Sequence, residues 1–427
     1  MNRHGRQYFV SLLTMLVVSM LLLGCRTTAV APVEVPAVVE EVVLPEPTVP
    51  DTLAETPVAD TTYSDLATRL SQLLADPILE RSQISLKVYD LTSDALVFQH
   101  QSAQRTRPAS CMKLLTAICA LDRLGADHLL TTALMIQPSK TDERACRNVF
   151  IRGALDPLFS NADLSVLLDS LSARGIQKIE GNIVLDVSMK DTLRYGKGWC
   201  WDDNNPVLYP LLINEKNTFA SALRTALQKR GIKIGGKITE GSTDATAVTI
   251  STVSHTLRQV LLPTLLNSNN LCAEAILYQI AASQRTLRAS AKDAQQVEMQ
   301  LLSLLGFQKS DYRLADGSGL SLYNYLSADI FIELLRCAYS RDDIRLPLME
   351  SLPVAGVSGT ISSRMKGTSA QGNIRAKTGT LTGVSSLSGY ATSAEGHTLC
   401  FSILNTGIDT QAEARGLQDR ICVELTR

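Results

Sequence analysis

The chain lacks the signatures of a metal centre and of nucleic-acid binding. Its five histidines stand at no metal-ligand spacing, and none of its nine cysteines forms a C-x-x-C pair, which argues against a zinc site or a thioredoxin-like motif. The formal net charge is -1, and the chain therefore has no basic excess to offer a nucleic acid. After the first 25 residues, no apolar run is long enough to span a bilayer. We therefore expect no metal and no nucleic-acid partner.

The chain has 427 residues and 45% hydrophobic content, which suits a globular protein with ample core. This length predicts two domains and a tail.

The first 25 residues have the pattern of an export signal. Arg3 and Arg6 open the chain, residues 8–23 are apolar, and a Leu-Leu-Gly-Cys sequence ends at Cys25. This sequence resembles the lipobox of bacterial lipoproteins, which implies cleavage before Cys25 and lipidation of its thiol. The alternative is a single N-terminal membrane anchor.

Residues 26–62 are predicted to be a disordered tether. Val, Pro, Glu, Thr and Ala predominate and aromatic residues are absent up to about residue 60, so the segment has little with which to build a core. A tether behind a lipid anchor lets a folded domain stand away from a membrane, and we expect an exported protein on the periplasmic side or at the cell surface.

The folded part is expected to be an α/β domain built from residues 63–130 and 255–427, with an inserted α+β domain at 131–254. Alternating residues predict a hairpin at 84–90 and 96–99, and the last helix is expected at about 412–425. Trp199 and Trp201 are expected to be buried at a domain junction.

Ser110 and Lys113 precede an apolar run at helical spacing, from Leu114 to Leu124. Residues three apart share one face of a helix, so an amine there can take the proton of the hydroxyl and activate it as a nucleophile. Burial of the helix would favour the uncharged amine. Ser363 and Lys366 have the same spacing, but a loop-like sequence follows them and we expect a solvated surface segment there.

Two further motifs each occur once, Ser268-x-Asn270 and Lys377-Thr378-Gly379. Ser268 could pass a proton between the amine and a leaving group, and Asn270 could hold a substrate amide. Lys377 and Thr378 offer a cation and a hydroxyl to a carboxylate, while Gly379 leaves a strand edge bare for a peptide.

The backbone N–H groups of Ser110 and Thr380 are the expected oxyanion hole. Cys111 is assigned a packing role. Singly, each motif would suit a structural purpose: a helix start, a helix cap and an edge strand.

Together and in this order, the three motifs resemble the signature of the penicillin-recognising serine enzymes. The fuller similarity is to class C penicillin-binding proteins, the D-Ala-D-Ala carboxypeptidase/endopeptidase family. It rests on several blocks between residue 63 and the C-terminus: 108–115, 198–203, 268–274, 316–320, 352–356 and 377–380.

The resemblance implies a transpeptidase-like fold, with an antiparallel sheet flanked by helices. It also implies hydrolysis of the D-Ala-D-Ala end of peptidoglycan stem peptides through an acyl-enzyme on Ser110, with endopeptidase cleavage of cross-links as a second reaction. β-Lactams would acylate the same serine, and no metal or organic cofactor is implied. The stretch between Ser110 and Ser268 is short for the family, so one inserted domain is expected rather than two.

Two other functions stay open from the sequence. One is a β-lactamase or esterase on the same fold, which requires efficient deacylation. The other is a non-catalytic envelope lipoprotein that binds peptidoglycan, against which the intact motif set argues.

Overall fold

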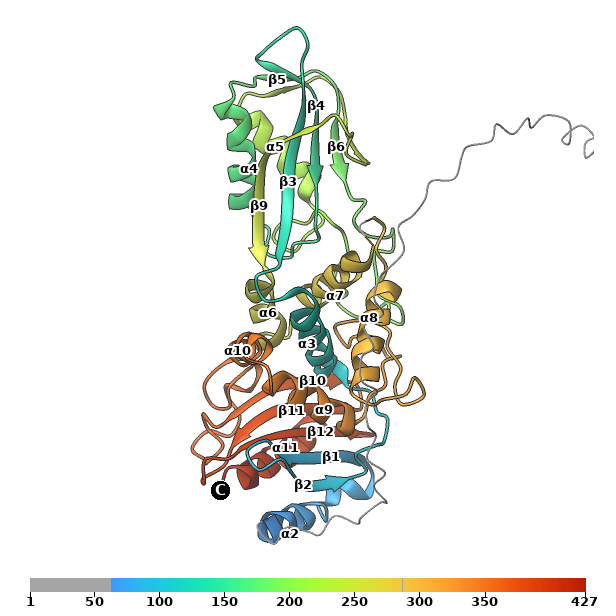
Figure 1. The fold of residues 1–427 in the computed structure, drawn as a ribbon, viewed down its shortest axis with the longest axis vertical. Coiled ribbons are helices and arrows are strands. Elements are labelled where there is room, and N and C mark those ends of the chain that lie inside the picture. The colour runs from blue at the N-terminus through green and yellow to red at the C-terminus, as the bar shows by residue number, and fades with distance from the viewer. Residues whose placement is uncertain (1–62, 286) are drawn as a thin grey trace, which may run out of the picture. The chain divides into compact units, whose positions relative to one another are not determined.

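The computed structural model describes residues 63–285 and 287–427, and Figure 1 shows the arrangement of their helices and strands. The predicted signal segment, the lipidated Cys25 and the tether lie outside the described residues. In the described part, none of the helices combines the length and the hydrophobicity that crossing a bilayer requires.

Strands from both ends of the described chain form one antiparallel sheet in the order β10-β11-β12-β1-β2. Its strands are β1 (Gln83–Asp90), β2 (Ala95–His100), β10 (Ile374–Leu381), β11 (Val384–Thr392) and β12 (Thr398–Thr406). The predicted hairpin is β1 and β2. Pairing of β1 with β12 joins the two ends of the described part of the chain, with Gln83 opposite Thr406.

Both faces of this sheet are covered, because side chains alternate along each strand. In β12, Phe401 and Ile403 enter a core shared with α2 (Ser64–Leu73) and α11 (Gln411–Leu425). Cys400 and Leu404 enter the opposite core, which is helical. The sheet is therefore the middle layer between two sets of helices (Figure 1).

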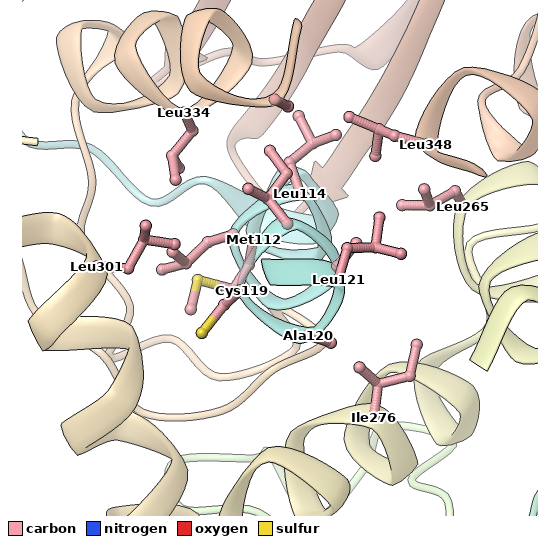
Figure 2. Close-up of a cluster of buried hydrophobic side chains, with 14 of the residues drawn as sticks. Met112, Leu114, Cys119, Ala120, Leu121, Leu265, Ile276, Leu301, Leu334 and Leu348 are labelled. Atoms are coloured by element: carbon pink, nitrogen blue, oxygen red, sulfur yellow. The ribbon is translucent and has the colours of Figure 1, made fainter. Parts of the chain in front are cut away.

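The helical core is built around α3 (Met112–Leu124), whose first ten residues are all buried. Figure 2 shows its side chains, among them Leu114 and Leu121, directed toward the surrounding helices. Gly125 ends the helix in the left-handed region, with φ of 76°. The surrounding helices are α6 (Leu257–Leu266), α7 (Asn270–Gln284), α8 (Ala291–Leu304), α9 (Ala328–Tyr339) and α10 (Asp342–Ser351).

A second sheet is formed by the middle of the chain and packs on a second hydrophobic core. Its strands are β3 (Leu129–Pro138), β4 (Ala145–Arg152), β5 (Lys178–Ile179), β6 (Ile183–Asp186), β7 (Lys233–Ile234), β8 (Ile238–Gly241) and β9 (Val248–Thr256). Three helices supply side chains to the same core: α4 (Asn161–Ala173), α5 (Phe219–Lys229) and the first half of α7. The chain enters and leaves this sheet at neighbouring positions, because Leu129 pairs with Thr256.

Candidate active site

Residues from all three sequence motifs line a single cavity of about 460 Å³. Its lining consists of Ser110, Ser268, Asn270, Thr360, Ser363, Arg364, Thr378, Thr380 and Arg415. Lys113 and Lys377 are not part of this lining, but each hydrogen-bonds to a residue that is.

Ser110 lies in a tight turn, Ala109–Cys111, that leads directly into α3. Ala109 has a φ of 48°, a left-handed conformation that is costly for any residue with a side chain. Gly319 packs against this turn so closely that a Cβ placed on it would lie 1.8 Å from the carbonyl oxygen of Ala109. On the other side, the Ser386 hydroxyl donates to the carbonyl oxygen of Pro108 at 2.6 Å. The surroundings thus hold Ala109, immediately before the serine, in a backbone conformation that a residue with a side chain does not favour.

The Lys113 amine is fully buried and has three oxygen neighbours. Its Nζ lies 2.7 Å from Asn270 Oδ1, 2.7 Å from the carbonyl oxygen of Ser318 and 2.9 Å from Ser110 Oγ. Desolvation by burial, and secondly the positive charge of Lys377, hold the pKa of Lys113 well below its ordinary value.

These contacts orient the lone pair of an uncharged Lys113. A neutral amine has two hydrogens and one lone pair, and both Asn270 Oδ1 and the Ser318 carbonyl are acceptors only. The two hydrogens therefore point at these acceptors, and the lone pair is left for the Ser110 hydroxyl. Ser110 and Lys113 are thus arranged as a nucleophile and its base.

The Ser318 carbonyl is positioned by two buried carboxyl groups, those of Glu274 and Asp316. One oxygen of Glu274 accepts the backbone N–H groups of Gly317 at 3.1 Å and Ser318 at 2.8 Å. Asp316 accepts the N–H of Gly319 at 2.9 Å. Burial, reinforced by the charge of Asp316, raises the pKa of Glu274 well above its ordinary value. The sequence indicated only a turn at residues 316–321. Packing of α7, which carries Glu274, against α3 brings this turn close to Lys113.

Ser268 and Asn270 lie where α6 ends and α7 begins. Ser268 has a left-handed backbone, with φ of 59°, and its Oγ accepts a hydrogen bond from Lys377 Nζ at 2.9 Å. Within residues 63–285 and 287–427, no hydrogen bond joins Ser268 directly to Lys113. Because Asn270 Oδ1 is occupied by Lys113, the amide donors of Asn270 remain for a ligand in the cavity.

The third motif occupies β10 at the edge of the first sheet. A Cβ on Gly379 would lie 2.3 Å from Ser386 Oγ and 2.6 Å from the carbonyl oxygen of Pro108, so only glycine lets the strand approach the turn before Ser110. The Thr378 hydroxyl donates to the Thr360 hydroxyl at 2.9 Å. Lys377 is fully buried, and this burial lowers its pKa to about 8.

The second Ser-x-x-Lys segment is solvated, as predicted. Ser363 and Lys366 are exposed and belong to a series of turns rather than to a helix. Ser363 nevertheless lines the cavity, because the turns after η4 (Gly359–Ile361) border it. Sequence reasoning missed this proximity, as well as that of Thr360 and Arg415, because none of them belongs to a recognisable motif.

The prediction that both tryptophans are buried is wrong for Trp201, which is 93% exposed. Trp199 is partly buried, and its indole N–H donates to Asp316 Oδ2 at 2.7 Å. Trp199 also packs against the core of the second sheet, whereas Trp201 lies in a turn and stays exposed.

The model of the D-Ala-D-Ala carboxypeptidase 3 (S13) family matches residues 66–210 and 211–426. The chain belongs to this family. It is 28% identical to the D-alanyl-D-alanine carboxypeptidase of Actinomadura sp. (strain R39), over 85% of this chain and 84% of that protein. It is 23% identical to the D-alanyl-D-alanine carboxypeptidase DacB of Haemophilus influenzae, over 79% of this chain and 88% of that protein.

Solved structures show the same fold. The crystal structure of penicillin-binding protein 4 from Haemophilus influenzae superposes with a TM-score of 0.75 at 23% identity, covering 85% of this chain and 98% of that one. A complex of that protein with a β-lactam gives a TM-score of 0.69 at 22% identity, over 83% and 97% of the two chains. The family predicted from the motifs, the fold class and the enzyme class, a serine-type D-Ala-D-Ala carboxypeptidase, are confirmed.

Proposed function

We propose that this family member removes the terminal D-alanine from peptidoglycan stem peptides through an acyl-enzyme on Ser110, and that β-lactams acylate the same hydroxyl. The observation that carries the proposal is the arrangement of Lys113, a buried amine with two acceptor-only neighbours and the Ser110 Oγ at 2.9 Å. Such an amine is a base positioned for one hydroxyl.

In the first step, Ser110 Oγ attacks the carbonyl carbon of the penultimate D-Ala while Lys113 Nζ takes its proton. The backbone N–H groups of Ser110 and Thr380 receive the developing negative charge. The close approach of β10 to the Ser110 turn, which Gly379 permits, supports this pairing of donors.

In the second step, the C–N bond breaks and the departing amine takes the proton that Lys113 removed from Ser110. Ser268 is the proposed relay, since it lines the cavity and its hydroxyl is bonded to the Lys377 ammonium. Asn270 donates to the substrate amide. Water then attacks the ester carbonyl, Ser110 regains its proton, and the free carboxylic acid leaves.

The decisive measurement is release of D-alanine from a stem pentapeptide by the purified full-length chain in detergent. We expect turnover, with stoichiometric covalent labelling by a fluorescent penicillin. A chain that takes up the label but releases no D-alanine would contradict the proposal.

The β-lactamase alternative predicts a different time course. A carboxypeptidase should hold the penicilloyl label for minutes or longer, whereas a β-lactamase should lose it within seconds as it hydrolyses the free drug. Mass spectrometry of the intact chain after mixing with penicillin separates these outcomes.

We further propose that residues 131–254 are an inserted domain. Support comes from a second hydrophobic core, supplied mostly by these residues, and from the adjacent positions at which the chain enters and leaves their sheet. Limited proteolysis should cut first near residues 125–128 or 256–258 if the insertion behaves as a unit, and scattered early cuts would argue against it.

We also propose that the chain is exported and lipidated at Cys25, which would place the enzyme on the cell envelope beside its substrate. The support is the sequence pattern at residues 1–25. Incorporation of labelled palmitate in a bacterial host should be lost in Cys25→Ala, and equal incorporation in both chains would contradict lipidation at this residue.

A further inference from the structure

The cation expected to bind the substrate carboxylate does not reach the cavity. The Lys377 side chain is fully buried, and its Nζ donates to Ser268 Oγ at 2.9 Å and to the carbonyl oxygen of Thr378 at 2.8 Å. Burial also lowers its pKa to about 8, so part of its charge is lost in mildly alkaline solution. An anion bound beside Thr378 and Thr380 therefore needs another positive group.

Two arginines line the same cavity, and they differ in what they already bind. Arg364 is 11% exposed and forms an ion pair with Asp419 at 2.7 Å, with a further bond to the Gln418 side chain. Its charge is compensated, and its Nε and Nη2 atoms already have acceptors on α11.

Arg415, on α11, is exposed, and its guanidinium donates to the Thr380 hydroxyl at 3.4 Å. Within the described part of the chain, no carboxylate lies within ion-pair distance of Arg415. Asp419, one helical turn further along α11, is already held by Arg364. The cavity thus has one arginine whose charge is available at the Thr380 end.

We propose that Arg415 recognises the free α-carboxylate of the substrate's C-terminal residue, together with the hydroxyls of Thr378 and Thr380. This inference deepens the proposed function and rests on it. An arginine can give a carboxylate two parallel charge-assisted hydrogen bonds, which a buried lysine cannot do. Binding there places the scissile amide between Ser110 and the carboxylate site.

The proposal defines the class of substrate. The residue after the scissile bond must carry a free carboxylate next to its nitrogen, as a terminal D-alanine does. A β-lactam with a carboxylate beside its ring nitrogen fits the same description. A peptide whose terminal carboxylate is converted to an amide lacks the partner of Arg415.

The test compares two substrates in two enzymes. The substrates are diacetyl-L-Lys-D-Ala-D-Ala and the same peptide with a C-terminal amide, and kcat/KM is measured for the native full-length chain and for Arg415→Gln. For the acid, Arg415→Gln should lower kcat/KM about 10- to 100-fold. For the amide, the two enzymes should differ by less than about threefold, because that substrate has no charge to lose. Arg415→Lys should recover part of the loss.

Arg420→Gln is the matched control, since Arg420 is on the same helix and pairs with Asp76, outside the cavity. It should leave both rates unchanged. If the native chain releases D-alanine but Arg415→Gln lowers kcat/KM equally for both substrates, or for neither, the proposed role of Arg415 is wrong while the proposed function stands. If the native chain hydrolyses neither substrate, the proposed function itself fails.

Discussion

Two segments of this chain have the same Ser-x-x-Lys spacing and entirely different surroundings. Ser110 and Lys113 open a helix whose first ten residues are buried, and the lysine amine is surrounded by three oxygen atoms. Ser363 and Lys366 lie in exposed turns, although Ser363 borders the same cavity. The comparison shows that the spacing alone does not make a nucleophile. The serine becomes a nucleophile when the neighbouring amine is buried, because only a desolvated lysine is an uncharged base near neutral pH.

The largest expected difference between the two segments is in covalent labelling. Ser110→Ala should reduce the rate of acylation by fluorescent penicillin at least ~10³-fold, because the attacking oxygen is removed. Ser363→Ala should change it by less than about threefold, because this hydroxyl has no base beside it. Labelling rates on gels measure both. Equal labelling of Ser110→Ala and the native chain would place the nucleophile elsewhere.

The next difference is in pH dependence. Acylation requires the unprotonated form of Lys113, so its rate should rise with pH and reach a plateau well below 10.5, since burial lowers the pKa of this amine. Lys366→Met should leave the profile unchanged, whereas Lys113→Met should abolish both the rate and its titration. A native profile that keeps rising through pH 10 would show that Lys113 is not desolvated as the structure indicates. The measurement is the second-order rate of penicillin acylation from pH 5 to 10.

Two glycines extend the comparison to the backbone. Gly379→Ala should destabilise the fold by about 1–3 kcal/mol and slow acylation, because the new Cβ would collide with Ser386 and with the carbonyl of Pro108. Gly367, next to the exposed Lys366, has a φ of 72° with no atom near its missing Cβ. Gly367→Ala should cost only about 1 kcal/mol, from backbone strain, and leave acylation intact. Denaturant unfolding and labelling rates check both, and equal acylation rates in the two variants would contradict the close approach at Gly379.

The smallest expected effect is on the free energy of unfolding and concerns the buried carboxyl group of Glu298, next to α3. Burial raises the pKa of Glu298 to about 8, so the folded state holds a proton that the unfolded state releases above about 4.5. The stability that this group contributes is present below pH 4.5 and is lost as the pH rises toward 8. Glu298→Gln should therefore match the native chain near pH 5 and exceed its free energy of unfolding at pH 8 by about 1 kcal/mol or more.

Thermal or denaturant unfolding at the two pH values measures this difference. Lys366→Gln is a fair control, because an exposed charge should alter stability little at either pH. Parallel pH curves for the native chain and Glu298→Gln would contradict the raised pKa.

Much of the site could be predicted from the sequence because each motif is local. Two residues at a helix start, two at a helix junction and three on a strand have chemical identities that a short stretch of sequence displays, and their order matched a known family. The apolar period after Lys113 also predicted the buried helix, and alternation predicted the hairpin.

The sequence by itself determined which groups are present: a hydroxyl and an amine one turn apart, a serine and an asparagine at a helix junction, and a glycine on a strand beside a lysine. Only the tertiary structure decided what each group faces. It turned the two hydrogens of Lys113 toward Asn270 and Ser318, buried Lys377 against Ser268, and placed Arg415, more than 300 residues from Ser110 in the chain, at the Thr380 end of the cavity. Burial and charge pairing depend on contacts between elements distant in sequence, so no local pattern could have specified them.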